Sequence, residues 1–286
     1  MKKILIIISA FMLTSCFLVS QVVSSPYNIK KSEKFNSPKG YAVLPPLGYG
    51  NKGIIQVSAK RQESFSFQKF SPNLVLEKEN IVSTNGKIPK NGRVERMIQT
   101  KNKTYLFVRN SEKEGITTLE FFPDQLDFAP TANQLFESSA AIYMQRYKTQ
   151  ETAPKENTSR RRGYGFCLSN DKTKFMYNYK LANKSERNEL NKVVLGVFVF
   201  DENLNKISGK EYILPYTEAY MDNLGYTLSN NGVAYMLARV YSKDDDKATK
   251  NANENYHYEV LVFDKDKTSP ESIELKLKDC FPQDSY

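Results

Sequence analysis

The amino-acid sequence predicts an all-β protein, built as a β-propeller-like array of about four four-stranded units. Two observations lead to this fold class. After Gly40, short runs of aliphatic, aromatic and β-branched residues alternate with clusters of Gly, Asn, Asp and Pro, and helix signals are almost missing. The same four-strand phrase then recurs along the chain, which is typical of the blades of a propeller.

The first half of the phrase is an apolar strand, a polar turn and a second apolar strand. Three copies of it occupy residues 96–107, 165–177 and 225–237. The second and third copies turn at Asn170-Asp171 and Asn231-Gly232, and these residue types tolerate the positive φ angles that tight hairpin turns require. We therefore expect hairpins at these positions.

The second half is a third strand that runs into an acidic or prolyl turn, followed by a fourth strand. Its copies occupy residues 119–126, 197–204 and 260–266, with a looser copy at 65–74. Fourth strands are expected near 75–82, 128–136, 207–214 and 273–277. The propeller-like domain would then span residues 40–286, with units near 40–83, 93–137, 163–214 and 220–278.

Two alternatives stay open at this point. A pair of β-sandwich domains also needs many short strands, but a sandwich would not repeat one four-strand phrase, so we favour the propeller. Propellers usually have about four to eight blades, and six or seven blades are more common than four. We therefore favour the interpretation that the chain is part of a larger, six- or seven-bladed propeller over the interpretation that four units are complete.

The N-terminus predicts export. Lys2 and Lys3 precede an apolar run at residues 4–13, which is too short for a comfortable membrane span, so residues 1–20 are expected to form a signal peptide. Residues 13–16 (Leu-Thr-Ser-Cys) resemble the lipoprotein box, which makes Cys16 the predicted lipidation site and the lipid a membrane anchor. Ordinary cleavage near Ser20 and an uncleaved anchor are the alternatives. Residues 21–39 are expected to be a flexible leader.

Three phrases carry a resemblance to known proteins: residues 168–171 (Leu-Ser-Asn-Asp), 200–204 (Phe-Asp-Glu-Asn-Leu) and 211–216 (Glu-Tyr-Ile-Leu-Pro-Tyr). With them, residues 90–280 resemble uncharacterised secreted β-propeller proteins and lipoproteins of Bacteroidota-type bacteria. The resemblance implies a fold and an exported location, either an outer-membrane lipoprotein or a periplasmic or extracellular protein. Its motifs are structural, so it implies no catalytic residues.

Composition and charge exclude several classes of protein. The formal net charge is +9, from 41 Lys and Arg against 32 Asp and Glu, which suits anionic glycans or a membrane surface. Nucleic acid is not an expected partner, because the chain is exported and the charge is not striped. If Cys16 is lipidated, only Cys167 and Cys280 remain, and two cysteines do not make a disulfide framework. We expect Cys167 to be a small buried apolar residue.

Known catalytic motifs are missing from the sequence. Residues 48–53 match G-x-G-x-x-G, but a β-strand follows them where the dinucleotide fingerprint needs a helix, so we interpret them as a glycine loop. No P-loop and no G-x-S-x-G motif is present. Because of this we expect no cofactor and assign no catalytic residue.

A metal site is not predicted either. The only histidine, His257, shares a strand face with Glu259, Leu261 and Phe263 by alternation, and we interpret it as a strand-end histidine that pairs with Glu259 or with solvent. A transition-metal site would need further His or Cys ligands. Residues 244–246 are all Asp but lack the spacing of a calcium loop.

Loop geometry supplies the one argument about function. Antiparallel strands place the second-to-third loops and the links between units on one face, and the long loops fall in these classes. The candidate binding residues on them are Arg160, Arg161, Arg162, Arg187, Lys243, Asp244, Asp245 and Asp246. We expect a non-catalytic binding or assembly module of the bacterial cell envelope that contacts protein or glycan through this face. The alternative is a glycan- or peptide-cleaving propeller enzyme that uses two carboxylates.

Overall fold

The computed structural model describes residues 38–60, 64–89, 92–110, 114–142, 164–182, 191–241 and 256–276. The predicted signal peptide, Cys16, nearly all of the leader, and every candidate binding residue on the long loops lie outside these ranges, as does Cys280. Among the described residues there is no helix of the length and apolarity that crossing a membrane requires.

Seventeen strands and one short 3₁₀ helix, η1 (Gly50–Lys52), make up the regular structure of the described residues. The first sheet holds β1 (Ala42–Gly48), β2 (Ile54–Lys60), β3 (Ser64–Phe70) and β4 (Leu76–Ser83). The second holds β5 (Gly92–Gln99), β6 (Thr104–Asn110), β7 (Gly115–Phe122), β8 (Asp127–Phe128) and β9 (Asn133–Glu137). The third holds β10 (Tyr164–Leu168), β11 (Lys174–Lys180), β12 (Lys192–Asp201) and β13 (Lys206–Thr217). The fourth holds β14 (Met221–Leu228), β15 (Ala234–Tyr241), β16 (Tyr256–Phe263) and β17 (Glu271–Leu275).

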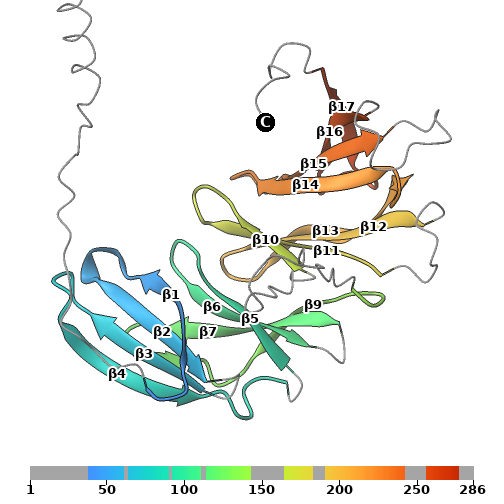
Figure 1. Ribbon diagram of the computed structural model, residues 1–286. Helices are drawn as coiled ribbons and strands as arrows, with labels where there is room; N and C mark the ends of the chain where they lie inside the picture. Colours follow the sequence, from blue (N-terminus) through green and yellow to red (C-terminus); the bar gives the residue numbers. More distant parts are fainter. Residues whose placement is uncertain are drawn as a thin grey trace, which may run out of the picture.

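The strand order confirms the predicted fold class. Each sheet is an antiparallel meander whose strands pair in chain order, and β9 joins the second sheet beside β7. The four sheets follow one another along an arc, with the first and the fourth at its two ends (Figure 1). The chain is therefore an all-β, propeller-like array of four sheets.

Three apolar layers hold this array together, one between each pair of successive sheets. The first layer is built around Phe67 and Phe121, whose rings stack with centroids 4.3 Å apart. The second joins the second and third sheets, and the third joins the third and fourth. The two middle sheets are thus covered on both faces, whereas two β-sandwiches would cover each sheet on one face only. The sandwich alternative is therefore wrong.

Burial on both faces explains why the middle strands are almost continuously apolar. On β6, Leu106 points into the layer with the first sheet and Phe107 into the layer with the third, and both are 0% exposed. On β10, Cys167 is half-buried against the layer with the fourth sheet and has a free thiol. Burial raises the pKa of this thiol.

The hairpin turns show the internal repeat at atomic detail. The hydroxyl oxygens of Thr100, Ser169 and Ser229 each lie within hydrogen-bond distance of the backbone carbonyl that closes the turn after the first strand, at 3.0, 3.1 and 2.9 Å. Because each hydroxyl also accepts a backbone N–H from that turn, these side chains replace part of the backbone ladder in the same way three times.

The third-to-fourth turns repeat as well. Leu74, Leu126 and Leu204 occupy equivalent places after the third strand, with φ of 62°, 57° and 68°. Leucine rarely adopts positive φ, so three occurrences at one place in the repeat indicate a common turn geometry. The second sheet departs from the expectation of one fourth strand at 128–136. Its strand is interrupted after Phe128, near Pro130, whose missing N–H cannot join a ladder.

Candidate functional site

The array has two long edges with different chemistry. We call the edge with the first-to-second and third-to-fourth turns of each sheet the turn side. The opposite edge, where the second-to-third connections and the links between sheets leave, is the loop side. Strands β11 and β15 end there and strands β12 and β16 begin there, so the segments 183–190 and 242–255 leave from the loop side, as does 143–163.

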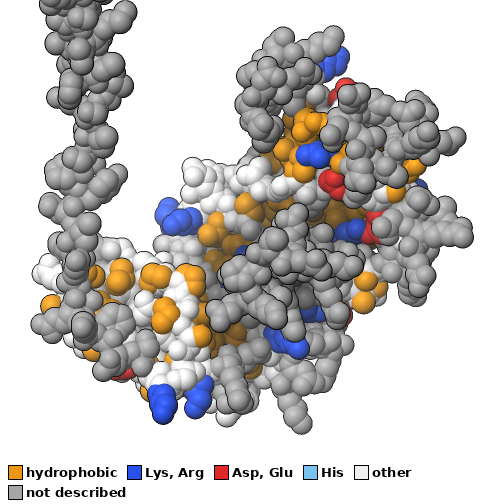
Figure 2. All heavy atoms as spheres, in the orientation of Figure 1, with side chains coloured by type: hydrophobic (Ala, Val, Ile, Leu, Met, Phe, Trp, Pro, Cys, Tyr) orange, Lys and Arg blue, Asp and Glu red, His pale blue; other side chains and the backbone are white. Residues whose placement is uncertain are grey.

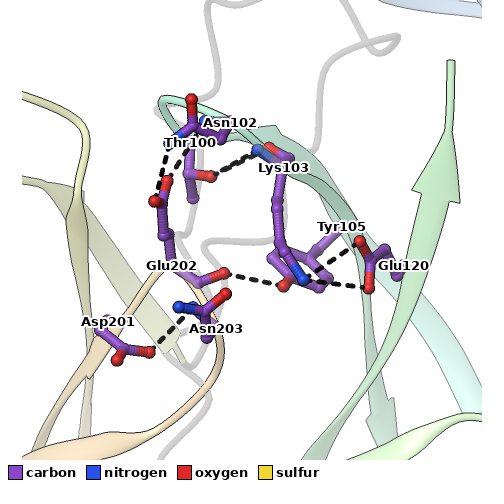
Figure 3. A network of polar contacts seen from close by, with 8 residues as sticks. All are labelled: Thr100, Asn102, Lys103, Tyr105, Glu120, Asp201, Glu202 and Asn203. Carbon is purple, nitrogen blue, oxygen red and sulfur yellow. Dashed lines mark hydrogen bonds and ion pairs between the residues drawn. The ribbon is translucent and has the colours of Figure 1, made fainter.

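On the turn side, a polar network locks the second sheet to the third (Figure 3). The Tyr105 hydroxyl donates to the backbone carbonyl of Glu202 at 2.8 Å. The side-chain amide of Asn102 donates to the Glu202 carboxylate at 2.8 Å, and the backbone N–H of Asn102 donates to it at 3.2 Å. Burial raises the pKa of Tyr105, and the nearby carboxylates of Glu120, Asp201 and Glu202 raise it further. Its hydroxyl therefore stays protonated and keeps donating.

The rest of this network is also satisfied. Asp201 accepts the backbone N–H groups of Asn203 and Asn205 at 2.8 and 2.9 Å and so shapes its turn. Lys103 forms an ion pair with Glu120 at 3.3 Å. These polar groups all have hydrogen-bond or ion-pair partners within the fold. The turn-side network therefore stabilises the contact between the second and third sheets.

On the loop side, three cations occupy the same register position in successive sheets. Arg109, Lys180 and Arg239 lie on the second strand of their sheets, each six residues beyond the residue whose carbonyl closes the first-to-second turn (Lys103, Lys174 and Val233). Arg109 pairs with Glu114 at 3.0 Å, and Lys180 pairs with Glu218. Arg239 forms no ion pair with any residue that the structure describes.

Arg239 instead lies in a cluster of tyrosines, which we call the Arg–Tyr cluster. Its guanidinium carbon is 5.0 Å from the ring centroid of Tyr256 and 6.0 Å from that of Tyr258, within cation–π range. Tyr241 accepts a long 3.5 Å hydrogen bond from Arg239 and donates to Asp222 at 2.7 Å. The hydrogen bond with Tyr241 raises the pKa of Arg239. The cluster is thus a permanently charged guanidinium held in place by aromatic rings.

The opposite face of β16 carries a second polar group, around Glu259. This carboxylate is only 7% exposed and is hydrogen-bonded by Tyr216, Ser272 and His257, the last at 2.6 Å. Burial alone raises the pKa of Glu259, but the hydrogen bonds from Ser272, Tyr216 and His257 outweigh it and leave the pKa below its ordinary value. The predicted pairing of His257 with Glu259 is confirmed.

The glycine loop at residues 48–53 is a turn between two strands. Tyr49 N–H donates to the carbonyl of Gly53 at 2.9 Å, and η1 lies between them. Gly53 has φ of +113°, and a Cβ there would lie 1.9 Å from the carbonyl oxygen of Phe70. Glycine is therefore required for the turn and its close contact with β3, and no dinucleotide helix follows.

Carboxylates are sparse where the first strands of the sheets lie next to one another. The described residues of β1, β5, β10 and β14 include only Glu95 and Asp222, which belong to different sheets, and Asp222 accepts the Tyr241 hydroxyl. Across the described ranges, no group of three or more His, Cys, Asp or Glu side chains could hold a metal ion. The most distinctive group in this part of the chain is the Arg–Tyr cluster. The sequence does not predict this cluster, because its members lie on different strands and meet only when those strands pair.

A scan of protein-family models finds no match, and neither does a search of curated proteins. Solved structures with limited similarity include an alpha-L-arabinofuranosidase from Clostridium thermocellum (TM-score 0.36, 12% identity, 82% of this chain, 73% of that one). Others are an endo-arabinase from Bacteroides thetaiotaomicron (0.34, 12%, 82% and 80%) and a Synechocystis apocarotenoid oxygenase mutant (0.31, 8%, 77% and 46%). Similarity at this level assigns neither a family nor an activity.

Proposed function

We propose that the chain is an exported, non-catalytic binding or assembly module of the bacterial cell envelope, which contacts protein or glycan through its loop side. The loop-side segments 143–163, 183–190 and 242–255 would carry the contact residues, among them Arg160, Arg161 and Arg162. Binding residues are commonly placed on loops that a rigid scaffold positions, and the three packed layers provide that scaffold.

The observation that carries this proposal is the contrast between the two edges. On the turn side, Tyr105, Asn102 and Glu202 satisfy one another. On the loop side, Arg239 remains without a carboxylate partner among the described residues and is flanked by Tyr256 and Tyr258. Aromatic and Arg side chains are enriched at binding surfaces, so the loop side has the chemistry that a partner can use.

Photo-crosslinking in cells tests this proposal directly. A photo-crosslinkable residue replaces Arg161 on the loop side or, as the matched control, the exposed Lys172 on the turn side. Both changes remove one positive charge. We expect crosslinks to an envelope protein or glycan from position 161 that clearly exceed those from position 172. Equal or weaker crosslinking from position 161 would contradict the proposal.

Export and lipidation belong to the same proposal and have a separate test. The mass of the N-terminal peptide of the native protein distinguishes a diacylated or triacylated Cys16 from a chain that is cut near Ser20. A Cys16→Ser variant should lose the acyl mass and leave the membrane fraction. An N-terminal peptide that begins at Met1 in the mature protein would contradict cleavage.

A further inference from the structure

Asparagine is followed by glycine at three places in the chain: residues 85–86, 91–92 and 231–232. Such a pair can react with itself, because the backbone nitrogen of the glycine can attack the side-chain amide carbon of the asparagine, and glycine has no Cβ to hinder the approach. Asn91 lies outside the described residues, and the N–H of Gly92 donates to the carbonyl of Pro89 at 2.8 Å. Asn85 and Asn231 are therefore the two asparagines of this kind within the described ranges.

Asn85 and Gly86 form the exposed tip of the turn that follows β4. The turn is closed by a hydrogen bond from the N–H of Lys87 to the carbonyl of Thr84 at 3.0 Å, and Gly86 has φ of +75°. The backbone N–H of Gly86 and the side-chain amide of Asn85 form no hydrogen bond with any residue that the structure describes. A Cβ built on Gly86 would meet no atom within 4 Å. The two groups that would react are therefore unoccupied and in open surroundings.

The same two residue types are held in place at Asn231 and Gly232, in the first-to-second turn of the fourth sheet. Gly232 is buried, and its N–H donates to the carbonyl of Ser229 at 3.0 Å. The hydroxyl of Ser229 lies within hydrogen-bond distance of the side-chain oxygen of Asn231. A Cβ on Gly232 would lie 3.5 Å from the side chains of Ile207 and Lys174. Both reacting groups are thus engaged in this turn, in contrast to the turn at Asn85.

We propose that Asn85 is a site of spontaneous chemical modification, at which the side-chain amide is converted to a carboxylate. A bond forms between the backbone nitrogen of Gly86 and Cγ of Asn85, and the bond from Cγ to Nδ2 breaks. Nδ2 leaves as ammonia, with the proton that the Gly86 nitrogen gives up. Water then opens the five-membered succinimide ring at either of its two carbonyls, which leaves aspartate or isoaspartate at position 85. The reaction needs no oxidant, reductant or cofactor.

The modification changes the charge of the loop side, because the link from the first to the second sheet begins at the loop-side end of β4. A carboxylate replaces a neutral amide on a chain with a formal net charge of +9. Lys and Arg side chains are spread over the face shown in Figure 2 and do not form one patch, so a new negative charge acts locally. Lys87 of the same link pairs with Asp127 of the second sheet at 3.2 Å, and the isoaspartate form lengthens the backbone of this link by a methylene group.

The test is peptide mapping by mass spectrometry of the full chain, sampled over time in mildly alkaline buffer. The change in mass from amide to acid is followed in the tryptic peptide 79–87 and in the peptide that contains Asn231. In the folded chain, Asn85 should convert on the order of tenfold or more faster than Asn231, because the hydrogen bonds of Gly232 and Ser229 must break before Asn231 can react. In urea the two sites should convert at similar rates, since unfolding removes this protection.

Two matched variants provide a second readout, by isoelectric focusing of the intact chain. Asn85→Gln should reduce the acidic species that accumulate with time, because the longer side chain would have to close a larger ring. Asn231→Gln should leave those species unchanged. Conversion at Asn231 that is as fast as at Asn85 in the folded chain would overturn the proposal, and so would an Asn85 that stays intact in the folded chain while both sites convert in urea. The loop-side crosslinking experiment is unaffected by any of these outcomes.

Discussion

The hydroxyl of Tyr105 offers a precise test of how the sheets are fastened together. Tyr105→Phe removes only the donor that reaches the Glu202 carbonyl at 2.8 Å, 97 residues away in the chain. The ring is 1% exposed and packs against Phe107 with centroids 6.2 Å apart, so the substitution creates no large cavity. We therefore expect the change in stability to report on one partly buried hydrogen bond between the second and third sheets.

The expected magnitude follows from this geometry. A hydrogen bond between neutral groups contributes about 0.5–1.5 kcal/mol, and leaving the partly buried carbonyl of Glu202 without its donor adds to this cost. Tyr105→Phe should accordingly destabilise the chain by about 1–2 kcal/mol, which lowers Tm by roughly 3–6 °C for a domain of this size. Urea unfolding followed by far-UV circular dichroism gives the free energy, and a thermal scan gives Tm.

The fourth sheet supplies the matched control. Tyr235 is, like Tyr105, the second residue of its strand and points to the same face, but its hydroxyl forms no hydrogen bond with a described residue. Tyr235→Phe should change stability by less than about 0.5 kcal/mol. If Tyr105→Phe costs no more than Tyr235→Phe, the view that the turn-side network fastens the sheets is refuted.

Two further predictions concern a turn and a buried carboxylate. Gly53→Ala should destabilise the chain by about 2 kcal/mol or more, because φ is +113° and the new methyl group would meet the carbonyl of Phe70; a urea midpoint equal to wild type would contradict this. Because the folded protein lowers the pKa of Glu259, its ionised carboxylate stabilises the fold at pH values above the ordinary glutamate pKa of 4.5. This contribution is lost as the pH falls through the pKa of Glu259 in the folded state. Asp171 acts in the same direction, since hydrogen bonds from Ser169 and Thr173 lower its pKa to about 2. Urea midpoints should therefore fall between about pH 5 and pH 2, and Glu259→Gln should flatten the upper part of this dependence; an unchanged slope would contradict the assignment to Glu259.

Local pattern was enough to predict the fold class and most of the strands. The expected strands near 75–82 and 207–214 correspond to β4 and β13, because alternation and turn residues are properties of neighbouring residues. The strand expected at 128–136 was wrong in detail: it is divided into β8 and β9, and β9 pairs with β7 after an interruption. The pairing of His257 with Glu259 was predictable for the same local reason, since two residues apart on a strand lie on one face.

The candidate site could not be predicted in this way. Arg239, Tyr241 and Asp222 meet because β14, β15 and β16 pair in a particular register, and a shift of one residue would turn each side chain to the other face. The difference between Arg239 and Arg109, in contrast, is local, because Glu114 lies only five residues after Arg109 in the chain. Each is an arginine at the end of an apolar strand in the sequence, and only the position of Glu114 gives one of them a carboxylate partner.

By itself, then, the sequence determined the strand-and-turn pattern, its repetition, and the turns that need Gly53 or a short hydroxyl side chain, because these depend on backbone torsion and on residues close in the chain. Only the tertiary structure decided that the two middle sheets each pack between two neighbouring sheets, while the first and the fourth each pack against one described sheet. It also determined that the Tyr105 hydroxyl donates to the backbone carbonyl of Glu202, 97 residues away in the chain. The physical reason is that burial and hydrogen bonding between sheets depend on which faces meet, and the same alternating strand fits a covered face and an open one equally well.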